Sequence, residues 1–522
     1  MPSKTIGFVF LLSLIPAWTK ATEWIYEIQP GDSLWNLSRQ FLKDINLWPR
    51  LQSLNSIEYP RRLQPGTKIR VPMEWLKTAP GSATVTNIYG DVISFDPGRQ
   101  PRKLNVGSIL HAGAVIQTAS SSNITLRFED DSIFLLKSHG EVKLKKLKVY
   151  PGTGMVDTRL EQEKGKSESK VKPKKGPGSR FEIKTPSAVA GVRGTVFRVE
   201  ASSNRQKTDS EVTKGEVDVK AGGAEQLIPR GFGTSAKRGE QPLPPVELLP
   251  APNLSNISPT FEQNPFYFRF PHITGAISYQ LEIAPNKQFT QLFFEQEFPS
   301  TTMKVSGLPD GNYVLRIRGV DHLGLEGFNG YHPFTVNTRP LPPKLLQPLP
   351  LSRISVNQPR FRWRASEKNF GYQLQLASDF NFHHILLNEC QLQTSNFIAK
   401  LLPPGKYYWR VAALDSRGKR GPFSPGQSFI QLPPPPEIKI IEHKGVPALL
   451  RWKKPYDDAR FRLQIAWDRE FEMIIADTRI DKPIFSISLL QPGDYFIRVK
   501  TDAAGWNGPF SRPLPLRIPP PQ

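Results

Sequence analysis

The sequence contains one cysteine, Cys390, among its 522 residues. A single cysteine cannot form a disulfide framework, and it excludes zinc sites built from several thiolates. Its position far from the N-terminus also excludes a lipid anchor on an N-terminal cysteine. We expect Cys390 to be a small apolar side chain inside a β-domain, and a nucleophilic role stays open as the alternative.

Groupings of residues that carry catalysis are also missing. The 8 histidines are scattered, and the adjacent pair His383 and His384 would point to opposite faces of a strand. The sequence has no Gly-rich phosphate loop, no serine nucleophile elbow and no zinc-ligand spacing. We therefore predict no catalytic residue, no metal site and no cofactor, and we expect that the protein is not an enzyme.

Long hydrophobic runs are absent apart from one near the N-terminus. Residues 6–16 form an apolar run that follows Lys4, has the length of a signal-peptide core and is too short to span a bilayer. The sequence Thr-Lys-Ala at 19–21 offers a small–x–small cleavage site, so we expect residues 1–21 to be a signal peptide, with an uncleaved anchor as the alternative. The mature chain is then expected to have no transmembrane segment and to lie in the periplasm or cell envelope.

Proline and positive charge are the features present in excess. The 51 prolines argue against long helices, because proline is tolerated at strand edges and in linkers but not inside helices. The chain is too long for one core, and its length suggests about three to five domains. Its net charge of +22 favours anionic partners, of which wall polymers fit an exported protein and nucleic acid does not.

Residues 22–75 show a strand–helix–helix–strand pattern. Trp24, Tyr26 and Ile28 alternate with polar residues, and Ser33 can cap a helix. The apolar positions of the two predicted helices, spaced as on a helical face, are Leu34, Leu37, Phe41 and Leu42, then Leu47, Trp48, Leu51 and Leu54. Residues 68–72 close the module with a short strand.

The runs YEIQPGDSLWNLSRQF, LWPRLQSLNSI and LQPGTKIRVP in this segment resemble the LysM (lysin motif) family. The resemblance implies binding of N-acetylglucosamine-containing glycans such as peptidoglycan in a shallow groove between two loops. The positions that match the groove are Gly31, Asp32, Ser33, Leu34, Asn55, Ser56 and Ile57. The alternative is that Gly31 and Asp32 only form the turn and cap the helix, and that Leu34 belongs to the core.

Residues 80–240 alternate apolar and polar residues with frequent Gly turns, which predicts an all-β domain. The lysine-rich stretch 161–178 has almost no apolar residues, so we expect a disordered, solvated loop there. The run TPSAVAGVRGTVFRV, followed by VTKGEVDVKA, resembles the FecR family, whose members include periplasmic sensor domains linked to sigma-factor control. The motif positions are Thr185, Pro186, Gly191, Arg193 and Gly194. Arg193 either contacts a partner or locks a tight turn through its donors.

Residues 241–252 form a Pro-rich segment that we expect to be a stiff, extended linker. A threefold internal repeat follows, at 253–340, 341–433 and 434–522. Each copy contains a run of the type YQLEIAPNKQF and a later run of the type LPPGKYYWRVAALD. The copies resemble fibronectin type III domains, with the buried tyrosine of that family at Tyr313, Tyr407 and Tyr495 and its tryptophan at Trp363 and Trp452. Phe270 takes the tryptophan position in the first copy.

The sequence thus predicts a mainly β, multidomain protein with a small βααβ LysM module, a FecR-like all-β domain and three immunoglobulin-like or fibronectin type III-like β-sandwiches. The interpretation that covers most of the chain is a non-catalytic, periplasmic, peptidoglycan-binding scaffold whose further partners are unidentified envelope proteins. Two alternatives stay open: an envelope signalling or sensor protein of the FecR type, and a cell-wall hydrolase with an unrecognised active site.

Overall fold

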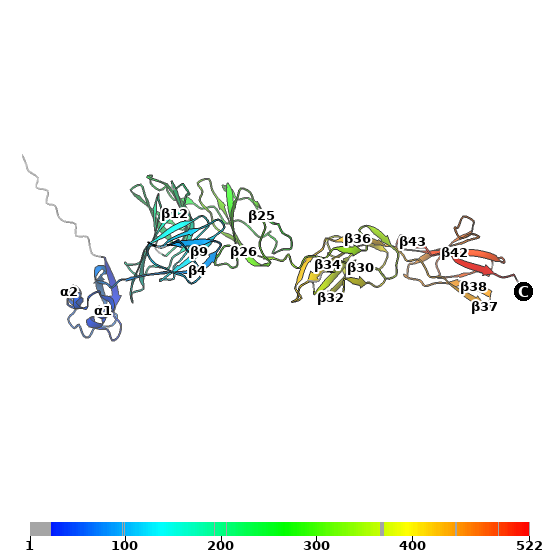
Figure 1. Cartoon of the computed structure of the whole chain (residues 1–522), viewed down its shortest axis with the longest axis horizontal. Helices are drawn as coiled ribbons and strands as arrows, with labels where there is room; N and C mark the ends of the chain where they lie inside the picture. Colours follow the sequence, from blue (N-terminus) through cyan, green and yellow to red (C-terminus); the bar gives the residue numbers. More distant parts are fainter. Residues whose placement is uncertain are drawn as a thin grey trace, which may run out of the picture. The chain divides into compact units, whose positions relative to one another are not determined.

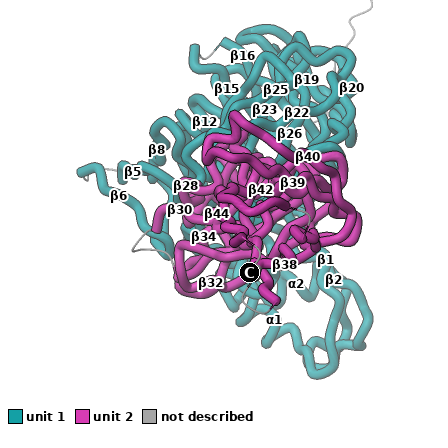
Figure 2. Tube along the Cα trace, turned by 90° about the vertical axis from the view of Figure 1, so that its right-hand side faces the viewer, with its two compact units in different colours: residues 1–259, 265–308, 312–335 teal, residues 260–264, 309–311, 336–522 magenta. Residues whose placement is uncertain are grey.

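The computed structural model describes residues 22–96, 98, 100–192, 194–204, 206–365, 370–443, 446–488 and 490–520. The signal peptide expected at 1–21 and the motif residue Arg193 lie outside the described residues. Strands dominate the fold, as predicted (Figure 1). No helix among the described residues has the length and apolarity needed to cross a membrane. The chain divides into two compact units, which are described separately (Figure 2). Unit 1 contains the described residues up to 259 together with 265–308 and 312–335, and unit 2 contains residues 260–264, 309–311 and the described residues from 336 onward.

The N-terminal module, residues 22–75, has the predicted βααβ order. Its elements are β1 (Glu23–Glu27), α1 (Leu34–Phe41), the 3-10 helix η1 (Ile45–Leu47), α2 (Trp48–Leu54), β2 (Lys68–Pro72) and the 3-10 helix η2 (Met73–Trp75). Strands β1 and β2 pair antiparallel, with Ile25 opposite Arg70. The predicted stripe is confirmed, since Leu34, Leu37 and Phe41 are buried beneath α1.

This module shares its core with the second domain, residues 79–247. Tyr150 and Met155, at the ends of the β11–β12 hairpin, belong to the same buried cluster as Trp24 and Phe41 of the module. The hairpin turn approaches closely, because a Cβ atom at Gly152 would lie 2.9 Å from the Phe41 ring. The module is therefore seated on the second domain through apolar packing.

The second domain is built of antiparallel strands, with one parallel pair, that close on themselves around a single apolar cluster. They are β3 (Ala79–Pro80), β4 (Ala83–Tyr89), β5 (Val92–Phe95), β6 (Arg102–Lys103), β7 (Ile109–Leu110), β8 (Val115–Thr118), β9 (Asn123–Phe128), β10 (Ile133–Leu136), β11 (Glu141–Tyr150), β12 (Met155–Lys170), β13 (Arg180–Lys184), β14 (Val189–Val192), β15 (Val196–Ala201), β16 (Lys207–Lys214), β17 (Glu216–Ala221), β18 (Ala224–Pro229), β19 (Phe232–Lys237) and β20 (Val246–Glu247). The period-two prediction for this domain is confirmed.

The prediction of a disordered loop at 161–178 is wrong for its first part, because β12 runs through Lys170. The first half of β12 pairs with β11, and the second half pairs with β10 and β15. The strand passes between these partners at Gly165, where a Cβ atom would lie 2.6 Å from the Gly140 Cα atom. Counting apolar residues missed this strand, because its buried side chains are polar and find polar partners, as when Ser167 donates to Gln162 at 2.6 Å. Residues 171–179 do form a loop.

The expected linker, 241–252, is attached to the second domain along part of its length. Strand β20 pairs with β19, the Leu243 N–H donates to the Ser235 carbonyl at 2.9 Å, and Leu248 is buried. The segment is extended, as predicted, but it does not act as a free spacer.

The first repeat is a two-sheet sandwich. Its strands are β21 (Thr260–Phe261), β22 (Phe266–Arg269), β23 (Ser278–Ala284), β24 (Phe294–Phe298), β25 (Thr302–Val305), β26 (Gly311–Val320) and β27 (Gly330–Val336). Strands β22 and β25 make the small sheet, and β27, β26, β23 and β24 lie in that order in the large one. Tyr313 and Phe270 are buried, as the repeat pattern predicts.

The second and third repeats have the same two-sheet plan. The strands of the second are β28 (Leu345–Gln347), β29 (Ser352–Ile354), β30 (Arg360–Trp363), β31 (Gly371–Ala377), β32 (Ile385–Leu392), β33 (Asn396–Ile398), β34 (Gly405–Leu414), β35 (Arg420–Phe423) and β36 (Gln427–Gln431). Those of the third are β37 (Lys439–His443), β38 (Val446–Arg451), β39 (Arg460–Ala466), β40 (Ile474–Ile480), β41 (Ile484–Ser486), β42 (Gly493–Ala503), β43 (Trp506–Phe510) and β44 (Leu514–Ile518). Tyr407 and Tyr495 are buried and donate to the carbonyls of Pro403 and Gln491, each at 2.7 Å.

Two expectations for the second repeat are wrong. Cys390 lies on the edge strand β32 and is exposed, so it does not fill the interior. His383 and His384 lie before β32 and not on a strand, and their backbone N–H groups both donate to the Asp379 carboxylate.

The second domain and the first repeat share a network of buried charges. Glu282 of β23 accepts hydrogen bonds from Arg316 Nε at 2.5 Å and Arg318 Nη2 at 2.6 Å. Lys137 of the second domain places its Nζ 2.5 Å from the same carboxylate. These four side chains are at most 2% exposed. Burial alone would raise the pKa of Glu282, but the surrounding cations hold it well below its usual range.

Further contacts extend this network across the boundary. Glu168 of β12 accepts two hydrogen bonds from Arg316, at 2.8 and 3.3 Å, and the guanidinium lowers the pKa of Glu168 to about 2 against the effect of burial. Asn123 exchanges two hydrogen bonds with the backbone of Leu292, at 2.8 and 3.1 Å. Because a buried charge without its partner costs about 3–5 kcal/mol, the two domains are expected to stay together.

Candidate glycan-binding site

The two loops predicted to form the groove meet in the N-terminal module. The first loop, residues 29–33, connects β1 to α1, and the second, residues 55–60, follows α2. The Leu34 N–H donates to the Pro60 carbonyl at 2.9 Å, which joins the start of α1 to the second loop. The structure therefore brings the two sets of predicted residues to one side of the module.

The first loop is fixed by its own hydrogen bonds. Gly31 has φ +91°, a left-handed conformation that glycine adopts without strain, and it is exposed. The Asp32 carboxylate accepts from the Tyr26 hydroxyl and the Gln29 N–H, each at 2.8 Å. Ser33 caps α1 by accepting from the Asn36 N–H at 3.2 Å. This loop is a preformed turn with an exposed tip.

The contact with Asp32 also affects Tyr26. Partial burial raises the pKa of Tyr26 to about 12, and the hydrogen bond and negative charge of Asp32 add to the rise. The phenol therefore stays protonated and keeps donating to Asp32 across the physiological pH range. This bond ties the middle of β1 to the loop.

The side chain of Leu34 is fully buried. It is therefore not available to a sugar, and it belongs to the core, as the alternative interpretation of the sequence expects. Its backbone N–H is used by the contact with Pro60, so it is not a free donor either. Leu34 therefore has a structural role beneath the two loops.

Asn55 in the second loop is also structural. Its side-chain amide donates to the Arg70 carbonyl at 2.9 Å and accepts from the Arg70 N–H at 2.6 Å, which fastens the end of α2 to β2. Ser56 is exposed, with φ +51°. Ile57 is half-buried against the module core. Of the predicted residues, Gly31 and Ser56 are exposed, Leu34 is buried, and the other four, Asp32, Ser33, Asn55 and Ile57, are half-buried.

Two aromatic side chains that we did not assign to the groove from the sequence lie beside the joined loops. Trp35 is 52% exposed and Tyr59 is 67% exposed. Each is next in sequence to one partner of the Leu34–Pro60 hydrogen bond. The apolar face of a pyranose ring packs well against such rings. A signal for Trp35 was present, because it falls outside the apolar stripe of α1 and must therefore point to solvent.

The motif residues of the second domain have structural roles. The Thr185 hydroxyl accepts from the Ala188 N–H at 3.0 Å and lies 2.6 Å from the Thr208 hydroxyl, so it shapes the turn that holds Pro186 between β13 and β14. Gly194 has φ +78°, and a Cβ atom there would lie 2.9 Å from Pro173. Gly191 lies on β14. The described residues of the motif therefore stabilise the fold of the domain, and none of them is assigned a role in binding.

Comparison with known families identifies two segments. Residues 26–72 match the model of the LysM domain, and residues 114–218 match that of the FecR protein. The matches lie in the N-terminal module and the second domain, and they confirm both resemblances inferred from the sequence. Both are binding or signalling domains without catalytic activity, and both are typical of cell-envelope proteins.

Several solved structures show local likeness. A putative anti-sigma factor from Parabacteroides distasonis is 16% identical, with a TM-score of 0.22, and the match covers 26% of this chain and 59% of that structure. The FN1–FN3 domains of chicken CNTN1 are 17% identical, with a TM-score of 0.16, over 49% of this chain and 94% of theirs. The fibronectin(III)-like modules of Clostridium thermocellum CbhA are 11% identical, with a TM-score of 0.15, over 34% of this chain and 94% of theirs. A search of curated proteins found no match.

Proposed function

We propose that this protein is a non-catalytic, peptidoglycan-binding adaptor of the periplasm. The N-terminal module binds N-acetylglucosamine-containing glycan in the groove between its two loops. The second domain and the repeats present surfaces to other envelope proteins. The observation that carries the proposal is the LysM match over residues 26–72, together with the Leu34–Pro60 contact that joins the two loops.

The seating of the module supports an adaptor. Its core continues into the hairpin of the second domain through Tyr150 and Met155, and the second domain is in turn locked to the first repeat by the buried charges around Glu282. The glycan-binding module is therefore held rigidly on the second domain and the first repeat, and it is not attached through a flexible linker. The net charge of +22 adds attraction to anionic wall polymers.

A second candidate function follows from the FecR match over residues 114–218. In this alternative the second domain senses an envelope signal, and a separate transducer carries it onward. The motif residues Thr185 and Gly194 serve the fold, so they do not favour this function over the first. A gene for a sigma factor beside the gene for this protein would favour it.

The glycan proposal is tested by titrating the full chain with an N-acetylglucosamine tetramer in a calorimeter. We expect saturable binding that is weakened about tenfold by Trp35→Ala and by Tyr59→Ala, because each loses one aromatic face against the sugar. The matched controls are Trp467→Ala and Tyr267→Ala, which remove aromatic side chains of similar exposure, 46% and 47%, outside the module. They should bind like the wild type.

Equal weakening by all four variants, or no binding by the wild type, would contradict the assigned groove. Point variants are preferable to deletion of residues 22–75, because the deletion would uncover Tyr150 and Met155 and disturb the second domain. Release of soluble fragments from peptidoglycan would instead support a hydrolase and contradict the non-catalytic assignment.

A further inference from the structure

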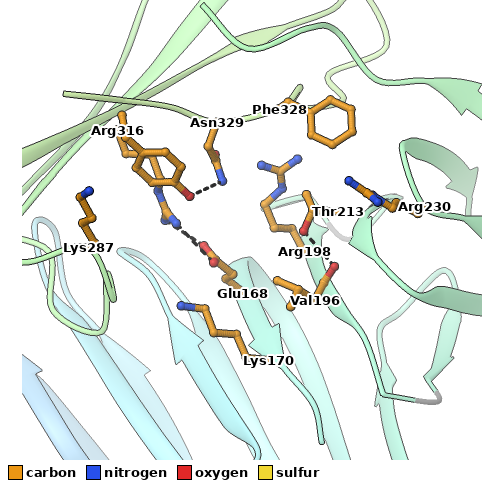
Figure 3. A pocket seen from close by; sticks show the side chains of 11 residues that line it. Glu168, Lys170, Val196, Arg198, Thr213, Arg230, Lys287, Arg316, Phe328 and Asn329 are labelled. Atoms are coloured by element: carbon orange, nitrogen blue, oxygen red, sulfur yellow. Dashed lines mark hydrogen bonds and ion pairs between the residues drawn. The ribbon is translucent and has the colours of Figure 1, made fainter. Parts of the chain in front are cut away.

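A pocket between the second domain and the first repeat lies beside the buried charge network. It has a volume of about 270 Å³. Strands β12, β15 and β16 form one wall, and β26 with the segment 328–331 forms the other (Figure 3). Phe328 and Tyr331 contribute aromatic surface. The pocket belongs to neither the glycan groove nor the FecR motif.

One donor in this pocket is buried and unused. The side chain of Arg198 is 5% exposed, its Nε faces Glu211 at 3.4 Å, and its Nη2 donates to the carbonyls of Glu326 and Gly327. Its Nη1 has no hydrogen-bond partner among the residues that the structure describes. Figure 3 shows the guanidinium projecting between Thr213 and the Phe328–Asn329 segment. A buried guanidinium donor without a partner is costly, and a ligand acceptor would satisfy it.

The pocket wall also carries excess positive charge. Lys170 donates to the neutral carbonyl of Gln288 at 2.8 Å, and within the described part of the chain no carboxylate pairs with it. Arg230 and Lys287 are exposed at the rim, and neither has a polar partner in the part of the chain that the structure describes. Glu168 is the acid of the wall, and its charge is already matched by Arg316. The remaining cations favour an anion in the pocket.

The arrangement of the donors selects the kind of anion. Lys170, Arg198, Arg230 and Lys287 lie on different sides of the pocket, as Figure 3 shows. A carboxylate offers two oxygens on one side, whereas a phosphate monoester offers three oxygens and a charge of about −1.5 to −2. The Tyr331 hydroxyl accepts from Asn329 at 3.1 Å, which leaves its own proton free to donate to the ligand.

We propose that this pocket binds a phosphate monoester group. The group could belong to a small phosphorylated molecule or to the headgroup of a phosphorylated lipid, since both present the same three oxygens. Arg198 would donate from the floor, and Arg230 and Lys287 would draw the anion in at the rim. This site goes beyond glycan binding and does not depend on it.

The test uses the full chain in phosphate-free buffer, titrated by calorimetry with inorganic phosphate and with glucose 6-phosphate. The rim variant R230Q/K287Q should weaken binding about tenfold, because two exposed charges near the anion are removed. The matched control R269Q/K304Q removes two exposed cations from strands β22 and β25 of the same repeat and should change affinity less than about twofold. R198K, which keeps the positive charge but loses the several N–H donors of the planar guanidinium, should also weaken binding.

The source of the phosphate is separated by sedimentation with phosphatidylcholine vesicles that contain or lack phosphatidic acid. Capture by phosphatidic acid that is lost in R230Q/K287Q supports a lipid headgroup, and binding of glucose 6-phosphate without vesicle capture supports a small molecule. The proposal is overturned if the wild type binds no phosphate probe at about 10 mM, a concentration that detects even weak sites. It is equally overturned if R230Q/K287Q and R269Q/K304Q behave alike, because the effect is then one of net charge.

Discussion

The first repeat and the other two repeats share one side-chain arrangement and use it in different surroundings. In each, a phenylalanine with positive φ packs its ring under an arginine of the long central strand. The ring-to-guanidinium distances are 4.2 Å for Phe289 and Arg316, 4.0 Å for Phe382 and Arg410, and 4.0 Å for Phe471 and Arg498. The shared arrangement makes the differences around it informative.

The arginine has a different partner in the first repeat, where the second domain covers this face. In the first repeat, Arg316 bonds to the carboxylate of Glu282, and the second domain closes over both. At the same position the other repeats have glutamines, and Gln375 and Gln464 accept from Arg410 and Arg498 at 2.9 and 2.8 Å. The pKa of Arg316 is raised by its acidic partners against the effect of burial, whereas desolvation lowers the pKa of Arg498. A neutral amide suffices where water screens the charge, but the buried face needs a carboxylate.

The neighbouring apolar position shows the same contrast. Leu292 is 1% exposed and packs against Leu135 of the second domain. Three residues after the phenylalanine in the other repeats stand Ile385 and Ile474, each 42% exposed. The repeats therefore differ less in fold than in whether this face is covered, and the predictions below test that difference.

The largest effect is expected from Glu282→Gln, which gives the first repeat the amide of the other two. Arg316, Arg318 and Lys137 would stay buried without their shared carboxylate, and unit 1 should lose about 3–5 kcal/mol of stability. The measurement is hydrogen exchange of β23 and β26 together with thermal unfolding. Unchanged protection of both strands would show that the buried charges do not hold the interface.

A smaller effect is expected from removing the covered leucine. Leu292→Ala should destabilise unit 1 by about 2–4 kcal/mol, because it leaves a cavity at a buried contact. The matched change Ile474→Ala, at an exposed position of the third repeat, should cost less than about 1 kcal/mol. Denaturant unfolding of both variants checks the difference. Equal losses of unfolding free energy would contradict the conclusion that the second domain covers Leu292.

The next effect is a dependence of stability on pH that we expect for unit 1, which contains Glu211. Burial raises the pKa of Glu211 to about 7, and the nearby Glu326 and Asp209 carboxylates add to the rise against the opposing effect of Arg198. The folded state therefore binds this proton more tightly than the unfolded state. Its stabilising contribution is complete at low pH and is lost as the pH rises from about 4.5 through 7, by at most about 1.4 kcal/mol per pH unit.

Thermal unfolding across this pH range checks that prediction. Glu211→Gln should flatten the decline for unit 1, because the amide does not titrate. The same dependence of stability on pH in the wild type and in Glu211→Gln would contradict the raised pKa of Glu211.

The smallest effect is expected from the reverse exchange, Gln375→Glu in the second repeat. The new carboxylate would pair with Arg410, which is only half-buried, and an ion pair of this kind adds less than about 1 kcal/mol. The unfolding midpoint of unit 2 should rise slightly and lose the gain at high salt. A gain as large as the loss in Glu282→Gln would remove the distinction between the covered and open faces.

Much of the fold could be predicted because its signals are local. Helical spacing at Leu34, Leu37 and Phe41, period-two alternation and the repeated tyrosine each report one element at a time. The βααβ module, the β-domain and the three sandwiches follow from them.

What the sequence alone did not show depends on contacts between domains. The later part of strand β12 was predicted as a disordered loop, because the buried Glu168 pairs with Arg316, which lies far away in the sequence. The same holds for Glu282 and for the unused donor of Arg198. In the candidate groove, the two loops lie together as expected, whereas the side chains of Leu34 and Asn55 support the fold. The exposed Trp35 beside the loops was not assigned to the groove from the sequence.

The central claim is that the N-terminal module binds the wall glycan, and sedimentation with purified peptidoglycan sacculi tests it most directly. The wild type and the control Tyr267→Ala/Trp467→Ala should pellet with the sacculi. The variant Trp35→Ala/Tyr59→Ala should remain largely in the supernatant, with its folding confirmed by an unchanged unfolding midpoint. Equal pelleting of the three folded proteins would contradict the account, because the joined loops would then not be the site of attachment.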